Sequence, residues 1–114
     1  MQLTEHTDGD VHVLSVVGRF DAESYMEFVE RCKTLIQSGM RRLVIDFSEL
    51  EYISSTGLSA LLMIAKNIRQ MDGVIGLCSL AERFYQIFEI AGLTKILDVF
   101  PSREQAIQSV HSAS

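Results

Sequence analysis

The sequence predicts an α/β domain with a mixed sheet of four to five strands and about four helices. Three observations predict it: an early hairpin signal, alternating β-rich and helical patterns after it, and a nearly continuous apolar run at 42–47. Continuous hydrophobicity is typical of a central strand covered on both faces. Alternating strands and helices favour parallel middle strands joined by right-handed crossovers. A chain of 114 residues holds one such domain, over residues 1–114, and is too short for two.

The first 17 residues predict an antiparallel hairpin. Residues 2–6 can form a short strand, and the run TDGD at 7–10 is a turn signal in which Asp-Gly suits a hairpin. Residues 11–17 include four valines, whose β-branched side chains favour a strand.

Two long helices are predicted next. For the first, Asp21 is expected as the N-cap and Gly39 as a left-handed end, and its apolar stripe is Tyr25, Phe28, Val29, Cys32, Leu35 and Ile36. The second helix begins near Gly57 and ends at Gly73, and its stripe is Leu58, Leu61, Leu62, Ala65 and Ile68. Residues 48–52 are expected to bridge the central strand to this helix.

The last third predicts two more strands and two more helices. A strand at 74–78 leads to a capping box of Ser79 with Glu82, and Gly92 ends the helix that follows. This helix is expected to bury Phe84, Ile87, Phe88 and Ala91. A short strand at 96–100 precedes a second capping box, Ser102 with Gln105, and a helix that buries Ala106, Ile107 and Val110.

Composition excludes several classes of function. A net charge of −5 and a pI near 5.1 argue against a general nucleic-acid binder, which needs a basic surface. The two cysteines, Cys32 and Cys78, fit buried free thiols, and the three histidines are scattered, so neither a metal site nor a cofactor is expected. The N-terminus does not resemble a signal peptide, and the longest apolar stretch, 58–65, is far short of a membrane span. We therefore expect a cytoplasmic protein without direct membrane insertion.

Three consecutive hydroxyl residues, Ser54, Ser55 and Thr56, lie where an apolar strand leads into the second helix. Serine before a helix is usually just a cap, but three hydroxyls exceed what one cap requires. A helix N-terminus favours negative charge because its free N–H groups and dipole point there. Gly57 is also expected to leave room for the close approach of another molecule's backbone. Our hypothesis is that one of these hydroxyls receives a phosphate.

Other polar residues follow strand ends in the predicted sheet. Asp21, residues 46–48 and Ser79 are expected at the edge where parallel strands end, with Asp21 near Ser55. Catalysis by the chain itself has little support, because no histidine lies near a strand end that faces this loop, and the sequence contains neither G-x-S-x-G nor a Gly-rich phosphate loop. Asp46 does not fit a phospho-accepting aspartate either, since no acidic pair follows the first strand and no lysine stands where the strand at 74–78 ends.

The exposed side of the second helix suggests a protein contact. Ser55, Ser59, Met63 and Lys66 fall roughly on one line, and Met63 lies outside the apolar stripe. A single exposed methionine is usually unremarkable, but beside a phosphorylatable serine it can contact a partner protein.

Three separated segments resemble one known family. The run RLVIDFSELEYISSTGL at 42–58 resembles the signature of STAS-domain anti-sigma factor antagonists. The run GRFD at 18–21 looks like the family's Gly-x-x-Asp segment, and FYQIFEIAGL at 84–93 looks like its Phe-x-x-x-Gly-Leu stretch. The resemblance extends over nearly the whole chain and implies a single STAS-like domain.

The resemblance also implies a mechanism. In this family the unphosphorylated protein binds an anti-sigma factor that is a serine kinase, and this binding releases the kinase's client. Phosphorylation of the antagonist ends the complex, and a PPM-type serine phosphatase reverses it, so the antagonist itself is not an enzyme. Carried over, the acceptor is Ser55, and Ser54 stands where the family has aspartate. The residues expected to contact partners are Asp21, Ser54, Thr56, Gly57, Leu58, Ser59, Met63 and Lys66.

Two other functions remain open at this point. One is an interaction module that is never phosphorylated, such as the STAS subunit of a lipid transporter or of a stress-signalling assembly. The other is a small nucleotide-binding α/β domain, which the missing Gly-rich loop disfavours.

Overall fold

A six-stranded mixed sheet forms the centre of the computed structural model, which describes residues 1–113. The strand order is β1-β2-β3-β5-β6, and β4 pairs with β2 beyond this path. Only β1 and β2 pair antiparallel among these strands; the other pairs are parallel. The strands are β1 (Gln2–Asp8), β2 (Val11–Phe20), β3 (Arg42–Asp46), β4 (Leu50–Ile53), β5 (Val74–Cys78) and β6 (Asp98–Phe100). The predicted hairpin, parallel middle strands and central β3 are confirmed, with one strand more than expected.

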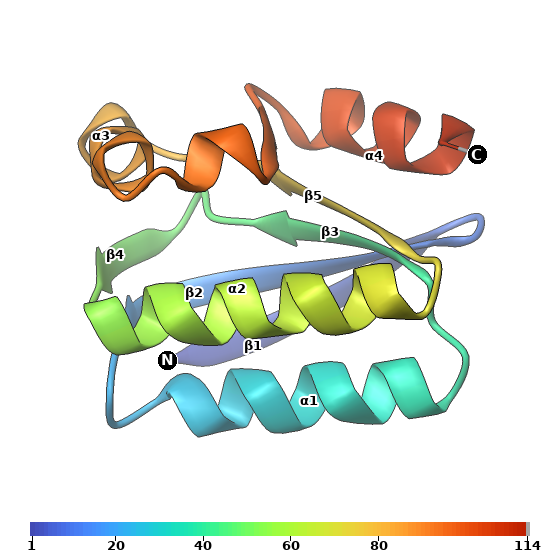
Figure 1. Cartoon of the computed structure of the whole chain (residues 1–114), viewed down its shortest axis with the longest axis horizontal. Coiled ribbons are helices and arrows are strands. Elements are labelled where there is room, and N and C mark those ends of the chain that lie inside the picture. Colours follow the sequence, from blue (N-terminus) through green and yellow to red (C-terminus); the bar gives the residue numbers. More distant parts are fainter. Residues whose placement is uncertain (114) are drawn as a thin grey trace.

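Helices cover both faces of the sheet (Figure 1). On one face α1 (Tyr25–Gln37) and α2 (Ser55–Gln70) lie side by side and run in the same direction. On the other face lie α3 (Glu82–Ile90), the 3-10 turn η1 (Leu93–Lys95) and α4 (Arg103–Ser112). The main core fills the space beneath α1, α2 and α3, and α4 closes a smaller cluster of Val11, Val13, Val44, Cys78, Ala106 and Val110.

Strand β4 is the strand that the sequence did not predict. The expected bridge at 48–52 contains most of it, and Leu50 and Ile53 are buried. Strand β4 pairs with Gly18–Phe20, a continuation of β2 beyond the predicted end at residue 17. Both misses have one cause, because each short segment becomes a strand only by pairing with the other.

Two predicted caps are wrong. Asp21 is not the N-cap of α1, which begins four residues later with Ser24 in the cap position. The Asp21 carboxylate instead accepts the N–H of Glu23 at 3.1 Å, and its carbonyl accepts the N–H groups of Ser24 and Tyr25. Ser79 does not form a capping box with Glu82, because α3 follows Ala81, and Ser79 adopts a left-handed φ of 62°.

Burial on the helices otherwise follows most of the predicted stripes. Phe84 and Phe88 anchor α3 in the core, but Ile87 is 39% exposed and Ala91 is also exposed, so the predicted α3 face is too wide. Helix α2 ends at Gln70, before Gly73, and buries Gly57, Ala60, Leu61, Ile64, Ala65 and Ile68. Gly39 has the expected left-handed φ of 104°. The expected Ser102 cap of α4 is confirmed by its hydroxyl, which accepts the N–H of Gln105 at 3.2 Å.

Candidate functional site

The start of α2 lies beside the loop that contains Asp21. Arg19 and Phe20 of β2 pair with Tyr52 and Ile53 of β4, so both strands end at the same edge. Directly after them, the backbone N–H of Ser54 donates to the carbonyl of Phe20 at 3.0 Å. The register therefore brings the Asp21 loop and the hydroxyl junction together, as the sequence predicts.

The three hydroxyl residues of the junction have different surroundings. Ser54 is the N-cap of α2, with extended backbone angles, and its partly buried hydroxyl accepts the N–H of Gly57 at 3.2 Å. Ser55 is the first helical residue and is exposed, whereas Thr56 is partly buried. The first turn of α2 contains no acidic side chain, so its free N–H groups and dipole favour an added negative charge. Of the three, Ser55 is the exposed one.

Gly57 is buried, and contacts within its own chain explain the glycine. A Cβ atom at this position would lie 2.5 Å from the carbonyl oxygen of Phe20 and 3.0 Å from Cγ1 of Ile53. No real Cβ approaches a backbone atom so closely. The expectation that the glycine leaves room for another molecule's backbone is therefore wrong. Its role is to let the first turn of α2 pack against the end of β2.

Asp21 forms a small polar cluster with neighbours that sequence reasoning missed. Arg19 Nε lies 3.3 Å from Asp21 Oδ2, and the Arg19 guanidinium lies 4.2 Å from the centre of the Tyr52 ring. Desolvation raises the pKa of Asp21, but the Glu23 N–H, the Ser24 hydroxyl and Arg19 together lower it below its ordinary value. The carboxylate is therefore charged at neutral pH. Only the pairing of β2 with β4 places Tyr52 under Arg19, and this pairing leaves no local signal in the sequence.

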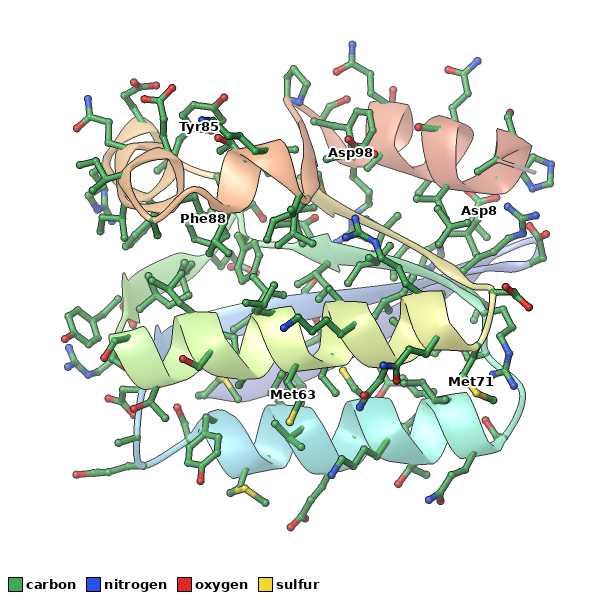
Figure 2. All side chains as sticks on the ribbon, viewed as in Figure 1. Asp8, Met63, Met71, Tyr85, Phe88 and Asp98 are labelled. Atoms are coloured by element: carbon green, nitrogen blue, oxygen red, sulfur yellow. The ribbon has the colours of Figure 1, made fainter. Side chains whose placement is uncertain are left out.

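The predicted line along the outside of α2 is present. Ser55, Ser59, Met63 and Lys66 are all exposed, and Met63 is 38% exposed. Leu58 is partly buried and packs against the main core, so only part of it faces solvent. Figure 2 shows Met63 on α2, directed toward α1.

Asp46 does not belong to this group. It lies on β3 and pairs with Ser15 of β2, which is five residues before Phe20. Arg103 of α4 reaches both residues, with Nε 2.8 Å from Asp46 Oδ2 and Nη2 2.9 Å from Ser15 Oγ. Burial raises the pKa of Asp46, but the N–H of Ser48 and the guanidinium of Arg103 lower it by more. Asp46 is therefore an ionised structural carboxylate that ties α4 to the sheet.

Ser79 is also outside the group. Its backbone N–H donates to the carbonyl of Phe100 at 3.1 Å, beyond the β5–β6 pair. The edge of the sheet therefore divides into two parts, and Asp21 and Ser55 share one of them.

Metal and thiol chemistry have no visible site in residues 1–113. Within them no three metal-ligating side chains come together. Cys32 and Cys78 are buried free thiols, and burial raises their pKa to about 12 and about 11, so that neither forms a thiolate readily. None of the helices in this part of the chain combines the length and the hydropathy of a membrane-spanning segment.

A family model named STAS domain matches residues 2–106. The chain belongs to the STAS domain family. The resemblance of this STAS protein to anti-sigma factor antagonists is also confirmed by its relatives. It is 41% identical over 78 residues to BtrV of Bordetella bronchiseptica, covering 68% of this chain and 67% of BtrV. It is 31% identical over 97 residues to the anti-sigma-B factor antagonist of Listeria monocytogenes, covering 84% of this chain and 80% of that protein.

Solved structures confirm the STAS fold. An anti-sigma factor antagonist from Mycobacterium paratuberculosis matches with a TM-score of 0.88 at 22% identity, covering 97% of this chain and 94% of that one. The Bacillus cell fate determinant SpoIIAA in its phosphorylated form matches with a TM-score of 0.76 at 18% identity, covering 96% and 99%. At these identities the likeness concerns the fold alone.

Proposed function

We propose that this STAS protein is an anti-sigma factor antagonist in a bacterial partner-switching pathway. Its unphosphorylated form binds an anti-sigma factor serine kinase and releases the client of that kinase. Phosphorylation of Ser55 ends the complex, and a PPM-type serine phosphatase restores the binding form. The Listeria relative named as an anti-sigma-B factor antagonist and the phosphorylated form of SpoIIAA support this proposal.

We choose Ser55 rather than Ser54 as the acceptor because the two serines have different surroundings. The Ser54 hydroxyl already caps α2, and modifying it would disrupt the bond to the Gly57 N–H. Ser55 is exposed at the first helical position, where a kinase can reach its hydroxyl without unfolding the helix. A phosphate there also meets the favourable end of the helix dipole, so that the phosphorylated domain can keep its fold.

The switch then operates through the surface around Ser55. Phosphate adds about −1.5 to −2 charges at neutral pH, close to the charged carboxylate of Asp21. The contact surface that we propose comprises Ser55 with Asp21, Thr56, Leu58, Ser59, Met63 and Lys66, while Ser54 and Gly57 hold the loop in shape. A loss of a few kcal/mol of binding free energy at such an interface lowers the affinity by about a hundredfold or more.

In this proposal the chain provides the acceptor and the partners provide the catalysis. It acts in the cytoplasm as a regulatory protein and is not an enzyme. No cofactor is needed by the antagonist itself, since the nucleotide is bound by the kinase.

Phosphorylation by the cognate kinase, followed by phosphate-affinity electrophoresis, tests the acceptor. The wild-type chain and the Ser54→Ala, Thr56→Val and Ser59→Ala variants are expected to shift in mobility, whereas Ser55→Ala is not. Ser59→Ala is the matched control, because it removes an exposed hydroxyl one turn further along the same helix. Full phosphorylation of Ser55→Ala would show that the acceptor is wrong.

A further inference from the structure

A groove lies between the C-terminal halves of α1 and α2. Its cavity of about 220 Å³ is lined by Lys33, Ile36, Gln37, Asn67, Gln70 and Met71. Figure 2 shows Met63 and Met71 at the same seam, Met63 between the two helices and Met71 at the end of α2. The cavity itself is distinct from the Ser55 end, because α2 continues for 15 residues beyond Ser55, about 22 Å of helix, and Met63 lies between the two.

The groove combines adaptable apolar groups with amides. Met63 on α2 is 38% exposed, and Met71, the residue that follows the end of α2, is 47% exposed. Methionine is flexible and polarisable, and it is common on surfaces that adapt to a partner's side chains. Gln37 and Gln70 add donors and acceptors at the rim of the cavity.

Charge is distributed unevenly around α1. Glu27, Glu30 and Arg31 line a different hollow next to β1, where Arg31 pairs with Glu5 at 2.6 Å. The side toward α2 contributes Lys33, and the groove lining includes no carboxylate. Lys66 adds a second exposed cation on the line of Met63 along α2. A chain with a net charge of −5 therefore presents a locally cationic, partly apolar groove.

The size of the cavity indicates what it can hold. Sites for small molecules usually enclose about 300–1,000 Å³, more than this cavity provides. An apolar side chain from a protein fits better, and a groove between two parallel helices accepts the apolar face of a third. Carboxylates on the flanks of such a helix would meet Lys33 and Lys66.

We propose that the groove between α1 and α2, from Met63 to Met71, binds an acidic amphipathic helix of a partner protein. One apolar side chain of that helix enters the cavity between Ile36 and Met71, and its carboxylates pair with Lys33 and Lys66. This docking is separate from phosphorylation at Ser55 and goes beyond the function proposed above. Because Met63 and Lys66 also belong to the contact surface proposed around Ser55, this helix and the kinase compete for the middle of α2, whereas Lys33, Ile36 and Met71 serve the helix alone.

Methyl NMR on the full unphosphorylated chain, with labelled methionines, tests this inference. The probe is a synthetic helical peptide of 16 residues, the length of α2, with a leucine stripe flanked by glutamates. It is expected to shift the methyl signals of Met63 and Met71 saturably, and to leave that of Met1, which precedes β1 and lies next to Gly18 of β2, unchanged. A peptide with lysine in place of glutamate is expected to bind at least tenfold more weakly.

Two charge variants complete the test. Lys33→Glu is expected to weaken the glutamate peptide at least tenfold, whereas Lys95→Glu, at an exposed site on the other face of the sheet, leaves its affinity unchanged. Ser55→Asp is also expected to bind this peptide like the wild type, which separates this docking from the phosphorylation switch. Equal affinity for both peptides, an unchanged affinity in Lys33→Glu, or no saturable shift at Met63 and Met71 would overturn the proposal.

Discussion

The hydroxyl of Ser54 accepts the backbone N–H of Gly57 at 3.2 Å. The two neighbouring serines therefore differ in role, because Ser54 caps α2 and Ser55 remains exposed. The bond also explains how Ser54 can stand where the family resemblance implies an aspartate before the proposed acceptor. Serine and aspartate are about equally good N-caps, so either side chain can satisfy the same N–H group.

Removing this cap is expected to destabilise the fold without removing the phosphorylation site. Ser54→Ala should lower the free energy of unfolding by about 1 kcal/mol, and the melting temperature by about 4 °C. Ser54→Asp should stay within about 0.5 kcal/mol of the wild type, because its carboxylate caps the helix and favours the dipole. Thermal unfolding followed by circular dichroism measures both. If the aspartate variant loses as much stability as the alanine variant, the capping explanation fails.

A negative charge at Ser55 is expected to preserve the fold and weaken the complex. Ser55→Asp places a carboxylate in the first turn of α2. This charge should raise the free energy of unfolding by about 0.3–1 kcal/mol at low ionic strength. Its affinity for the kinase, measured by calorimetry, should fall about a hundredfold. Ser109→Asp, on an exposed position of α4, controls for added charge and should bind like the wild type. Unchanged affinity of Ser55→Asp for the kinase would show that the surface around Ser55 is not the binding interface.

Gly57→Ala tests the contact between α2 and β2. Alanine favours helices by about 1 kcal/mol, but its Cβ would overlap the Phe20 carbonyl, and overpacking typically costs about 1–3 kcal/mol. We expect a net loss of stability, seen as a lower urea midpoint with an unchanged slope. The exposed neighbour Ser59→Ala should stay within about 0.5 kcal/mol of the wild type. A stabilised Gly57→Ala would contradict the close packing.

Arg103→Gln is expected to destabilise the protein in a pH-dependent manner. The loss at neutral pH should be about 1.5–3 kcal/mol, because charged hydrogen bonds to buried Asp46 are removed. A folded-state pKa below the ordinary 3.8 stabilises the fold above that pH, and this stabilisation disappears as the pH falls through the folded pKa. The difference in unfolding free energy between Arg103→Gln and the wild type should therefore be smaller when urea unfolding is measured below about pH 4. Arg83→Gln, over the Phe84 ring on α3, is the control and should show no such narrowing.

Local patterns in the sequence were sufficient for much of this protein. The hairpin, the central strand β3, the four helices and the cap at Ser102 all follow from side-chain periodicity and turn residues. The hydroxyl junction and the exposed line of Met63 follow from the same patterns. Such signals come from interactions within a few residues, so that a short stretch of sequence contains the whole cause. The resemblance to a family then singled out Ser55.

The tertiary structure decided the features that join distant segments. Pairing with Gly18–Phe20 turns residues 50–53 into a strand, and the close approach of α2 to Phe20 requires glycine at position 57. The ion pair of Arg103 with Asp46 spans 57 positions of the chain. Each of these depends on packing between segments that are remote in sequence, and such packing leaves no periodic pattern in either one. For the same reason, only the fold shows that the backbone N–H of Ser54 donates to the carbonyl of Phe20 and so places Ser55 beside the loop of Asp21.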